Sequence, residues 1–238
     1  MLRILLLSCT MLVAAAAAAS TPPGPSPATI DITHDVLRNG VHIAVIHERF
    51  EAADGRYSIV SESKAIGLFR LAQPRPAILT SAGEMTANGL QPEHFAGSRG
   101  ANDARRAEAQ FDWAASALTL THDGKHDTLP LPPGTQDRLS IMYQFMFYRY
   151  DGRRALDFPM TNGRKLDRYR YAVQENVEIE TPLGRMATLH LVKQRDPGDT
   201  ETEIWLAPQH RYLPVRMVIV EDDGVRYEQL MTGLEVGP

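Results

Sequence analysis

Apolar and polar side chains alternate in short segments along most of the chain beyond residue 30. Segments with this period of two include 41–45 (VHIAV), 118–121 (LTLT) and 168–173 (RYRYAV). Successive side chains of a β-strand point to opposite faces, so such a segment predicts a strand with one apolar face. The pattern therefore predicts a protein built mainly of half-buried strands.

Asx-Gly pairs separate many of these alternating segments. The pairs are Asn39-Gly40, Asp54-Gly55, Asn88-Gly89, Asp123-Gly124, Asp151-Gly152, Asn162-Gly163 and Asp223-Gly224. Two-residue hairpin loops need positive φ angles, which Asn, Asp and Gly tolerate best. Strands joined by such loops are antiparallel neighbours, and the sequence therefore predicts an antiparallel meander.

The segment 137–148 (DRLSIMYQFMFY) has a helical period instead. Its apolar positions, spaced three or four residues apart, are Leu139, Met142, Tyr143 and Met146. This spacing predicts one short amphipathic helix, with Thr135 or Asp137 available to cap its first turn. Residues 101–110 leave two alternatives open, a second helical turn or an alanine-rich loop.

A long antiparallel sheet curls, closes into a barrel or splits into two packed sheets. Because only one helix is available to cover a face, we expect a mainly β fold. Its meander curls into an open or half barrel with one short amphipathic helix packed against it. A single helix is small for a barrel of this length, and the sequence leaves open whether the interior is hollow or filled.

The first 19 residues have the pattern of a cleavable secretory signal peptide. Arg3 precedes an apolar run over 4–13, and six alanines at 14–19 supply small-residue cleavage sites. We expect cleavage near Ala19, a periplasmic mature protein without a membrane span, and loss of the single cysteine, Cys9, with the signal. Residues 20–29 predict a flexible Pro/Ser/Gly-rich tether, and residues 30–238 a single β-rich domain.

Charge and residue spacing argue against several kinds of chemistry. The net charge is −4, whereas nucleic-acid-binding proteins normally carry a strongly basic face, so we expect no nucleic-acid partner. His42 and His47 lie an odd number of residues apart and point to opposite faces of a strand, which does not suit a metal site. Ser61 and Lys64 match an S-x-x-K pattern, but within a strand rather than the helix that this chemistry needs. We expect no catalytic residues, no metal and no cofactor.

Several short blocks, in order along the chain, resemble a known family. The blocks are Asn88–Pro92 with Phe95, Phe111–Trp113, Gln136–Ser140, Thr181–Gly184, Trp205–Pro208 and Leu213–Arg216. Together they resemble the proteobacterial exported family catalogued as domain of unknown function 3108, over roughly residues 41–234. The resemblance implies an exported β-rich domain. It implies no activity and no catalytic residues.

Six polar or aromatic residues in or beside these blocks are our candidates for ligand binding. They are Asp112, Trp113, Asp137, Arg138, Trp205 and Arg216. The acidic Asp137 suits a helix N-terminus, and Arg138 or Arg216 could pair with Asp112. The default role of each tryptophan is packing, with its indole N–H bound to an acceptor.

We therefore expect a non-catalytic periplasmic protein that binds an apolar or amphipathic ligand, such as a lipid or a lipidated chain, inside the curved sheet. Two alternatives stay open. One is an envelope enzyme that acts on polysaccharide or peptidoglycan through Asp112, Asp137 and an arginine. The other is a scaffold that docks an envelope protein along an open sheet edge.

Overall fold

The computed structural model describes residues 28–99, 103, 106–194 and 199–237. The expected signal peptide and most of the expected tether lie outside these residues. In the described part of the chain no helix is long and apolar enough to cross a membrane.

The described chain forms one sheet of fifteen strands. They are β1 (Thr29–Arg38), β2 (Val41–Ala53), β3 (Arg56–Ala65), β4 (Ala77–Thr86), β5 (Gly89–Ser98), β6 (Ala107–Asp112), β7 (Ala117–His122), β8 (Lys125–Pro130), β9 (Gln136–Asp137), β10 (Ala155–Thr161), β11 (Leu166–Thr181), β12 (Gly184–Gln194), β13 (Glu201–Ala207), β14 (Leu213–Val220) and β15 (Arg226–Gly237). The order across the sheet is β8-β7-β6-β5-β4-β3-β2-β1-β15-β14-β13-β12-β11-β10-β9. Four short helices complete the fold: α1 (Phe69–Ala72), α2 (Ser140–Gln144), and the 3₁₀ turns η1 (Phe145–Phe147) and η2 (Pro208–His210).

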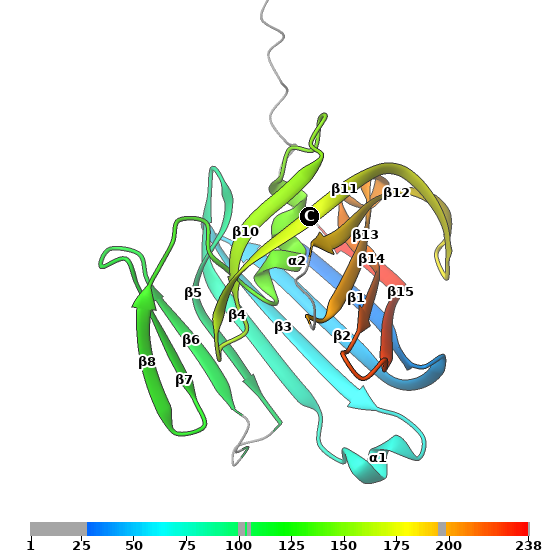
Figure 1. Cartoon of the computed structure of the whole chain (residues 1–238), viewed down its shortest axis with the longest axis horizontal. Coiled ribbons are helices and arrows are strands. Elements are labelled where there is room, and N and C mark those ends of the chain that lie inside the picture. Colours follow the sequence, from blue (N-terminus) through cyan, green and yellow to red (C-terminus); the bar gives the residue numbers. More distant parts are fainter. Residues whose placement is uncertain (1–27, 100–102, 104–105, 195–198, 238) are drawn as a thin grey trace, which may run out of the picture.

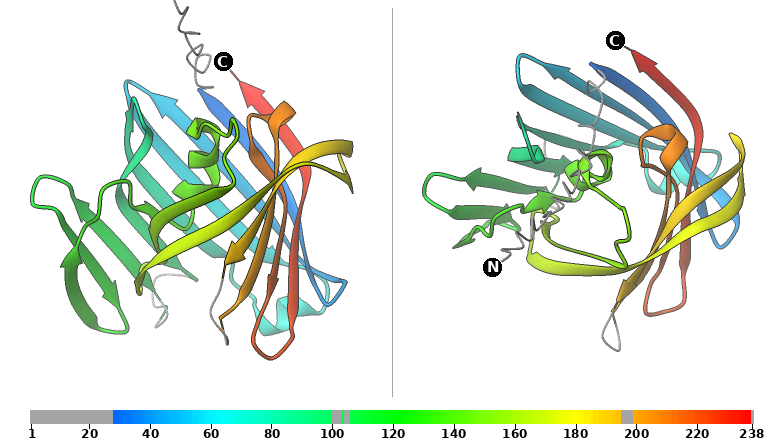
Figure 2. Two further views of the ribbon diagram at one scale, coloured as in Figure 1. Left: turned by 45° about the horizontal axis from the view of Figure 1, so that its top comes forward. Right: turned by 90° about the horizontal axis from the view of Figure 1, so that it is seen from above.

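The sheet is a meander whose first and last strands meet in its middle. β1 pairs antiparallel with β15, with Ile30 opposite Val236, and every other pairing is antiparallel except the short parallel one between β9 and β10. The sheet curls around α2 and stays open, since β8 and β9 form its two ends (Figures 1 and 2). This confirms the predicted half barrel with a helix against it.

The Asx-Gly pairs join neighbouring strands at six of the seven predicted places. At Asn39-Gly40, for example, φ is 48° and 81°, the doubly positive geometry of a two-residue hairpin loop. The exception is Asp151-Gly152, which lies between η1 and β10 rather than between two paired strands.

Residues 107–110 form the first part of β6, so neither alternative for residues 101–110 describes them. Ala107, Ala109 and Phe111 are buried, and Glu108 and Gln110 alternate with them on the other face. Ala107 and Ala109 are therefore small side chains on the inner face of a strand.

The helix is shorter than the predicted 137–148. Gln136 and Asp137 pair with β10 as β9, and α2 starts at Ser140. The Asp137 carboxylate caps α2, because its Oδ1 accepts hydrogen bonds from the backbone N–H groups of Leu139 and Ser140, both at 2.8 Å. The backbone tightens into η1 after Gln144, and the Tyr150 hydroxyl donates to the Phe145 carbonyl at 2.9 Å.

Helix α2 fills one part of the half barrel. Tyr143 stacks on Phe50 of β2 with ring centroids 5.2 Å apart, and Phe145 packs edge-on against Phe158 of β10 at 6.2 Å. Each such buried aromatic contributes roughly 1.5–3 kcal/mol through removal of apolar surface from water. The packing of α2 on β2 and of η1 on β10 holds the two arms of the curled sheet around this helical segment.

Candidate functional site

A second part of the half barrel is open and contains a cavity of about 690 Å³. It is bounded by the inner face of β1 to β6, by α1 and by the turn between β10 and β11. The side chains that line it are mostly apolar or small, and they include Val36, Ala44, Ile46, Ser63, Ala65, Phe69, Leu79, Phe95, Gly97 and Ala107. Small-molecule sites have this size and this kind of lining.

The choice of side chains along β3 explains where the cavity begins. Inward-pointing positions of a strand lie two residues apart, and on β3 they are large at Tyr57 and Ile59, which are buried, but small at Ser61, Ser63 and Ala65. The large residues belong to the core that packs around α2. The small residues leave a space that α2 does not fill, and this space is the cavity.

Arg138 contributes a positively charged side chain to the lining of this mostly apolar cavity. The residue lines the cavity and is exposed to solvent there. Burial lowers the pKa of Arg138, and the weaker influences of Tyr169, Asp137 and Glu48 oppose that shift. An arginine side chain keeps its charge in a protein nonetheless. Within the described residues, the guanidinium has no hydrogen-bond or ion-pair partner.

The turn between β10 and β11 closes the cavity wall. Gly163 has φ of +85°, and a Cβ there would lie 3.1 Å from the Cβ of Ala107 and 3.1 Å from the Phe95 ring. Arg164 forms an ion pair with Asp123 in the β7–β8 turn. These contacts bring the two arms of the open sheet together without strand pairing.

The comparisons with known proteins define the family. The family model described as "Protein of unknown function (DUF3108)" matches residues 29–230. This chain belongs to the DUF3108 family. No curated protein matches the chain.

Comparison with solved structures finds matches that cover most of this DUF3108 protein. A β-barrel-like protein of DUF1849 from Brucella abortus has a TM-score of 0.54 and 10% identity, over 89% of this chain and 99% of that chain. A candidate lipoprotein from Parabacteroides distasonis has a TM-score of 0.36 and 10% identity, over 88% and 96%. A candidate exported protein with a YmcC-like fold from Bacteroides fragilis has a TM-score of 0.31 and 9% identity, over 88% and 96%. The first of these shows a shared barrel-like fold.

Of the six residues predicted for the site, Arg138 alone lines the large cavity of this DUF3108 protein. Its neighbour Asp137 is fully buried, and the Ser81 hydroxyl donates to Asp137 Oδ2 at 2.6 Å. Burial raises the pKa of Asp137, and the hydrogen bonds from Ser81, Ser140 and Leu139 act against that rise. Asp137 therefore holds the helix and contacts no solvent.

Asp112 does not pair with either predicted arginine. It is exposed at the end of β6 and accepts a hydrogen bond from the backbone N–H of Ala115 at 2.8 Å. Phe111 points inward, so alternation turns the next side chain, Asp112, outward. Trp113 has the expected packing role: its indole N–H donates to the Pro92 carbonyl at 2.7 Å, and its ring stacks on Phe111.

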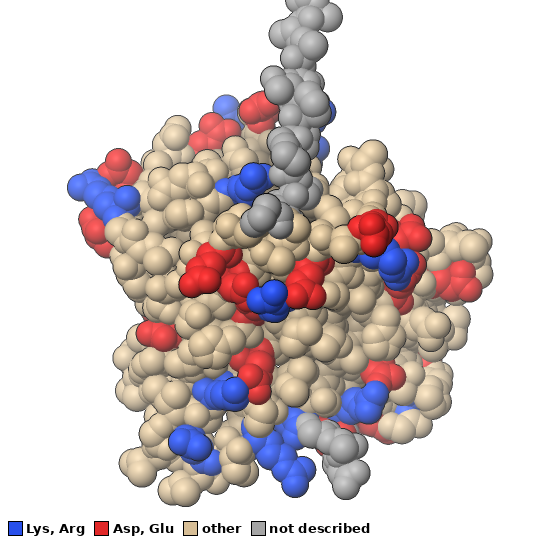
Figure 3. Space-filling view, turned by 180° about the vertical axis from the view of Figure 1, so that it is seen from behind, with Lys and Arg blue, Asp and Glu red and all other residues tan. Residues whose placement is uncertain are grey.

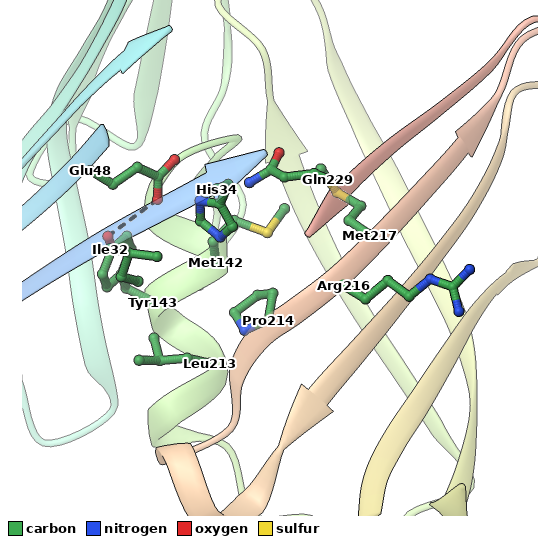
Figure 4. Close-up of a pocket in the computed structure, with 10 residues that line it drawn as sticks. All are labelled: Ile32, His34, Glu48, Met142, Tyr143, Leu213, Pro214, Arg216, Met217 and Gln229. Carbon is green, nitrogen blue, oxygen red and sulfur yellow. Dashed lines mark hydrogen bonds between the residues drawn. The ribbon is translucent and has the colours of Figure 1, made fainter. Parts of the chain in front are cut away.

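Trp205 and Arg216 come together on the opposite face of the sheet from the cavity. Ile204 and Leu206 belong to the core around α2, and Trp205 lies between them on β13, so it points the other way. His190 stacks on one side of the indole at 4.3 Å, and the Arg216 guanidinium lies over the ring at 4.7 Å. Arg216 also pairs with Glu228 at 2.7 Å. Trp205 is buried in this row, and neither Trp205 nor Arg216 lines the cavity of about 690 Å³, although Arg216 lines the small space shown in Figure 4.

Sequence reasoning missed a polar group between the cavity and α2 (Figure 4). Glu48 accepts hydrogen bonds from Ser61 at 2.9 Å and from the Tyr143 hydroxyl at 3.2 Å. Beside them, His34 is buried, and its Nδ1 has no hydrogen-bond partner among the described residues. Burial lowers the pKa of His34. The space next to these groups, about 20 Å³, has room for about one water molecule.

Proposed function

We propose that this DUF3108 protein is a non-catalytic protein of the cell envelope that binds an amphipathic ligand, such as a lipid or a lipidated chain. The ligand occupies the cavity of about 690 Å³ inside the half barrel. One observation carries this proposal: a mostly apolar cavity of ligand size opens beside a helix that fills only part of the barrel. Burial of an apolar chain against that lining supplies the binding energy.

The structure favours ligand binding over the enzyme alternative. That alternative needs Asp112, Asp137 and an arginine around one accessible pocket. Asp137 is sealed in the core, and Asp112 is turned outward at the end of β6. The two carboxylates therefore do not flank a substrate in this fold.

The scaffold alternative depends on a free sheet edge, and the edge at β8 is poorly suited to pairing. β8 is six residues long, carries exposed Lys125 and Asp127, and ends at Pro130, which has no N–H to donate. Short, charged edges of this kind oppose the addition of another strand. The outer face in Figure 3 carries acidic and basic side chains interspersed, without one dominant charge.

The envelope location is part of the proposal, and the signal-like pattern over residues 1–19 supports it. N-terminal sequencing of protein recovered from the periplasmic fraction tests this part. We expect a mature chain that starts near Ser20. A cytoplasmic protein that retains Met1 would contradict the location without affecting the cavity.

Filling the cavity tests ligand binding. Ser63 lines the cavity between Ile46 on β2 and Ala77 on β4, so Ser63→Trp places an indole inside it. Val60 lies on the same strand, is 46% exposed and points outward, so Val60→Trp is the matched control. We expect the wild type and Val60→Trp to bind a fluorescent fatty-acid analogue with similar affinity. Ser63→Trp should bind it at least tenfold more weakly. Equal binding by all three proteins would refute the proposed site.

A further inference from the structure

We infer that the ligand of the cavity carries an anionic group, a carboxylate or a phosphate, and that the Arg138 guanidinium binds this group. The inference rests on the proposed function, because it requires that the cavity hold a ligand. It adds the chemical class of that ligand and the orientation in which it binds, with its charged end toward the β9–α2 junction and its apolar part along β2 to β5.

The backbone fixes Arg138 at the cavity wall. Its N–H donates to the Thr161 carbonyl at 2.9 Å, and the residues on either side, Asp137 and Leu139, are both buried. The Asp137 carboxylate also binds the backbone N–H of Leu139 at 2.8 Å. Because both neighbours are anchored in the core, position 138 cannot turn away, and its side chain stays beside the cavity.

The acids near Arg138 are already engaged by other groups. Glu48 accepts hydrogen bonds from Ser61 and Tyr143, and Asp137 accepts them from Ser81 and from the first turn of α2. Neither acid lies within ion-pair distance of the guanidinium, although both influence it electrostatically. The five N–H donors of Arg138 therefore remain available to a ligand.

Arg138 differs in this respect from Arg49 and Arg216, two arginines on strands of the sheet. Arg49 on the outer face binds Asp31 through two contacts of 3.0 Å, and Arg216 binds Glu228 at 2.7 Å. Arg138 is exposed in the cavity, so a ligand there can reach its N–H donors. A carboxylate or phosphate offers the guanidinium two parallel charge-assisted hydrogen bonds.

The charges that line the cavity also favour an anion. The lining includes Arg99, Arg138 and Arg164 against two acids, Asp103 and Asp123. Asp123 pairs with Arg164, and Asp103 accepts a hydrogen bond from the backbone N–H of Arg99 at 2.6 Å. Among the described residues, the cavity wall is thus net positive in a chain whose overall net charge is −4.

A set of probes that share one chain and differ in headgroup tests the inference. The probes are tetradecanoic acid, tetradecyl phosphate, tetradecanol and tetradecylamine, and binding to the full chain is measured by isothermal titration calorimetry below their micelle concentrations. We expect the acid or the phosphate to bind about ten- to one-hundred-fold more tightly than the alcohol, because a hydrogen bond to a charged group is added. The amine should bind most weakly. Whichever of the two anions binds more tightly shows whether the charged group of the ligand is a carboxylate or a phosphate.

The matched variants are Arg138→Met, Arg138→Lys and, as a control, Arg168→Met, which removes an exposed arginine that pairs with Asp157. Arg138→Met should bind the acid, the phosphate and the alcohol alike, while alcohol binding stays as in the wild type. Arg138→Lys should keep part of the preference for anions, and Arg168→Met should keep all of it.

The outcomes separate the two proposals. If the wild type binds all four probes equally, or if Arg138→Met keeps the preference for anions, the role of Arg138 is refuted and ligand binding stands. If no probe binds to the wild type, the proposed function fails together with this inference. Unchanged alcohol binding in Arg138→Met shows that the variant is folded.

Discussion

Asp137 and Arg138 are consecutive residues with opposite surroundings. The Asp137 carboxylate is fully buried and accepts hydrogen bonds from Ser81 and from the N-terminus of α2, whereas the Arg138 guanidinium opens into the cavity. The short strand β9 (Gln136–Asp137) thus attaches the helix to the sheet. The residue that follows it, Arg138, places a cation at the edge of the cavity. Two adjacent residues therefore have separate roles: Asp137 stabilises the helix, and Arg138 determines the charge at the cavity wall.

Replacement of Asp137 should destabilise the protein strongly. Asp137→Ala removes the cap of α2 and leaves the buried Ser81 hydroxyl without its acceptor, so we expect a loss of about 2–4 kcal/mol in the free energy of unfolding. Asp112→Ala is the matched control, because exposed Asp112 accepts one hydrogen bond, from the Ala115 N–H. It should cost about 0.5–1 kcal/mol. Urea unfolding measures both, and equal losses would contradict the structural role of Asp137.

The stacking of Tyr143 on Phe50 should contribute more to stability than the Tyr143 hydroxyl. Tyr143→Ala removes a fully buried ring from between α2 and β2, and we expect a loss of about 3–5 kcal/mol. Tyr143→Phe removes only the hydrogen bond to Glu48 and should cost about 1 kcal/mol. Thermal or urea unfolding of the two variants separates packing from hydrogen bonding. A larger loss in Tyr143→Phe would overturn this ranking.

Gly163 should be sensitive to substitution because of both its backbone angle and its neighbours. An alanine there would keep φ of +85° and press its Cβ against Ala107 and Phe95, so we expect Gly163→Ala to cost about 2–4 kcal/mol. Gly152 has φ of +67° and no atom within 4 Å of the added Cβ. Gly152→Ala should therefore cost about 1 kcal/mol, the backbone contribution alone. If Gly163→Ala and Gly152→Ala lose the same free energy of unfolding, the close approach of Gly163 to Ala107 and Phe95 is contradicted.

Glu228 should make stability depend on pH in acid. Burial acts to raise the pKa of Glu228, but hydrogen bonds and charges from Arg226 and Arg216 outweigh burial and hold that pKa below 4.5. The ionised form is therefore favoured by folding, so its contribution is present above pH 4.5 and is lost as the pH falls through the lowered pKa. At pH 7, Glu228→Gln should lose about 1 kcal/mol relative to the wild type.

The pH profile of unfolding distinguishes this effect from a general loss of packing. The stability difference between the wild type and Glu228→Gln should shrink as the pH falls below 4.5. Glu180→Gln is the control, since exposed Glu180 lies 3.9 Å from Arg185, and it should leave the profile unchanged. A difference that grows on acidification would contradict the role of Glu228.

The meander was predictable because its signals are local. The loop Asn39-Gly40 and the alternation around Ile43 need only neighbouring residues to be recognised. The pairing of β1 with β15, which sets Ile30 opposite Val236, joins the ends of the described chain, and no local pattern indicates it. The start of α2 was misplaced because Asp137 serves both as a strand residue and as the helix cap.

The candidate site was predictable only in part. Arg138 was selected for a pairing with Asp112 that does not form, yet it lines the cavity. The direction of Trp205 was ambiguous because its neighbours Ile204 and Leu206 are apolar as well, so alternation is hidden in that segment. The cavity itself depends on small inward-pointing residues such as Ser63. Such residues indicate an open space only when it is known that α2 packs against another part of the sheet.

The most direct test of the central claim is a native mass spectrum of the protein isolated from its own envelope without detergent. We predict that the wild type carries one amphipathic molecule per chain. Val60→Trp should carry the same molecule, and Ser63→Trp should carry none. A wild-type spectrum that shows only the ligand-free chain, under conditions that keep the protein folded, would contradict the assignment of the cavity as a binding site.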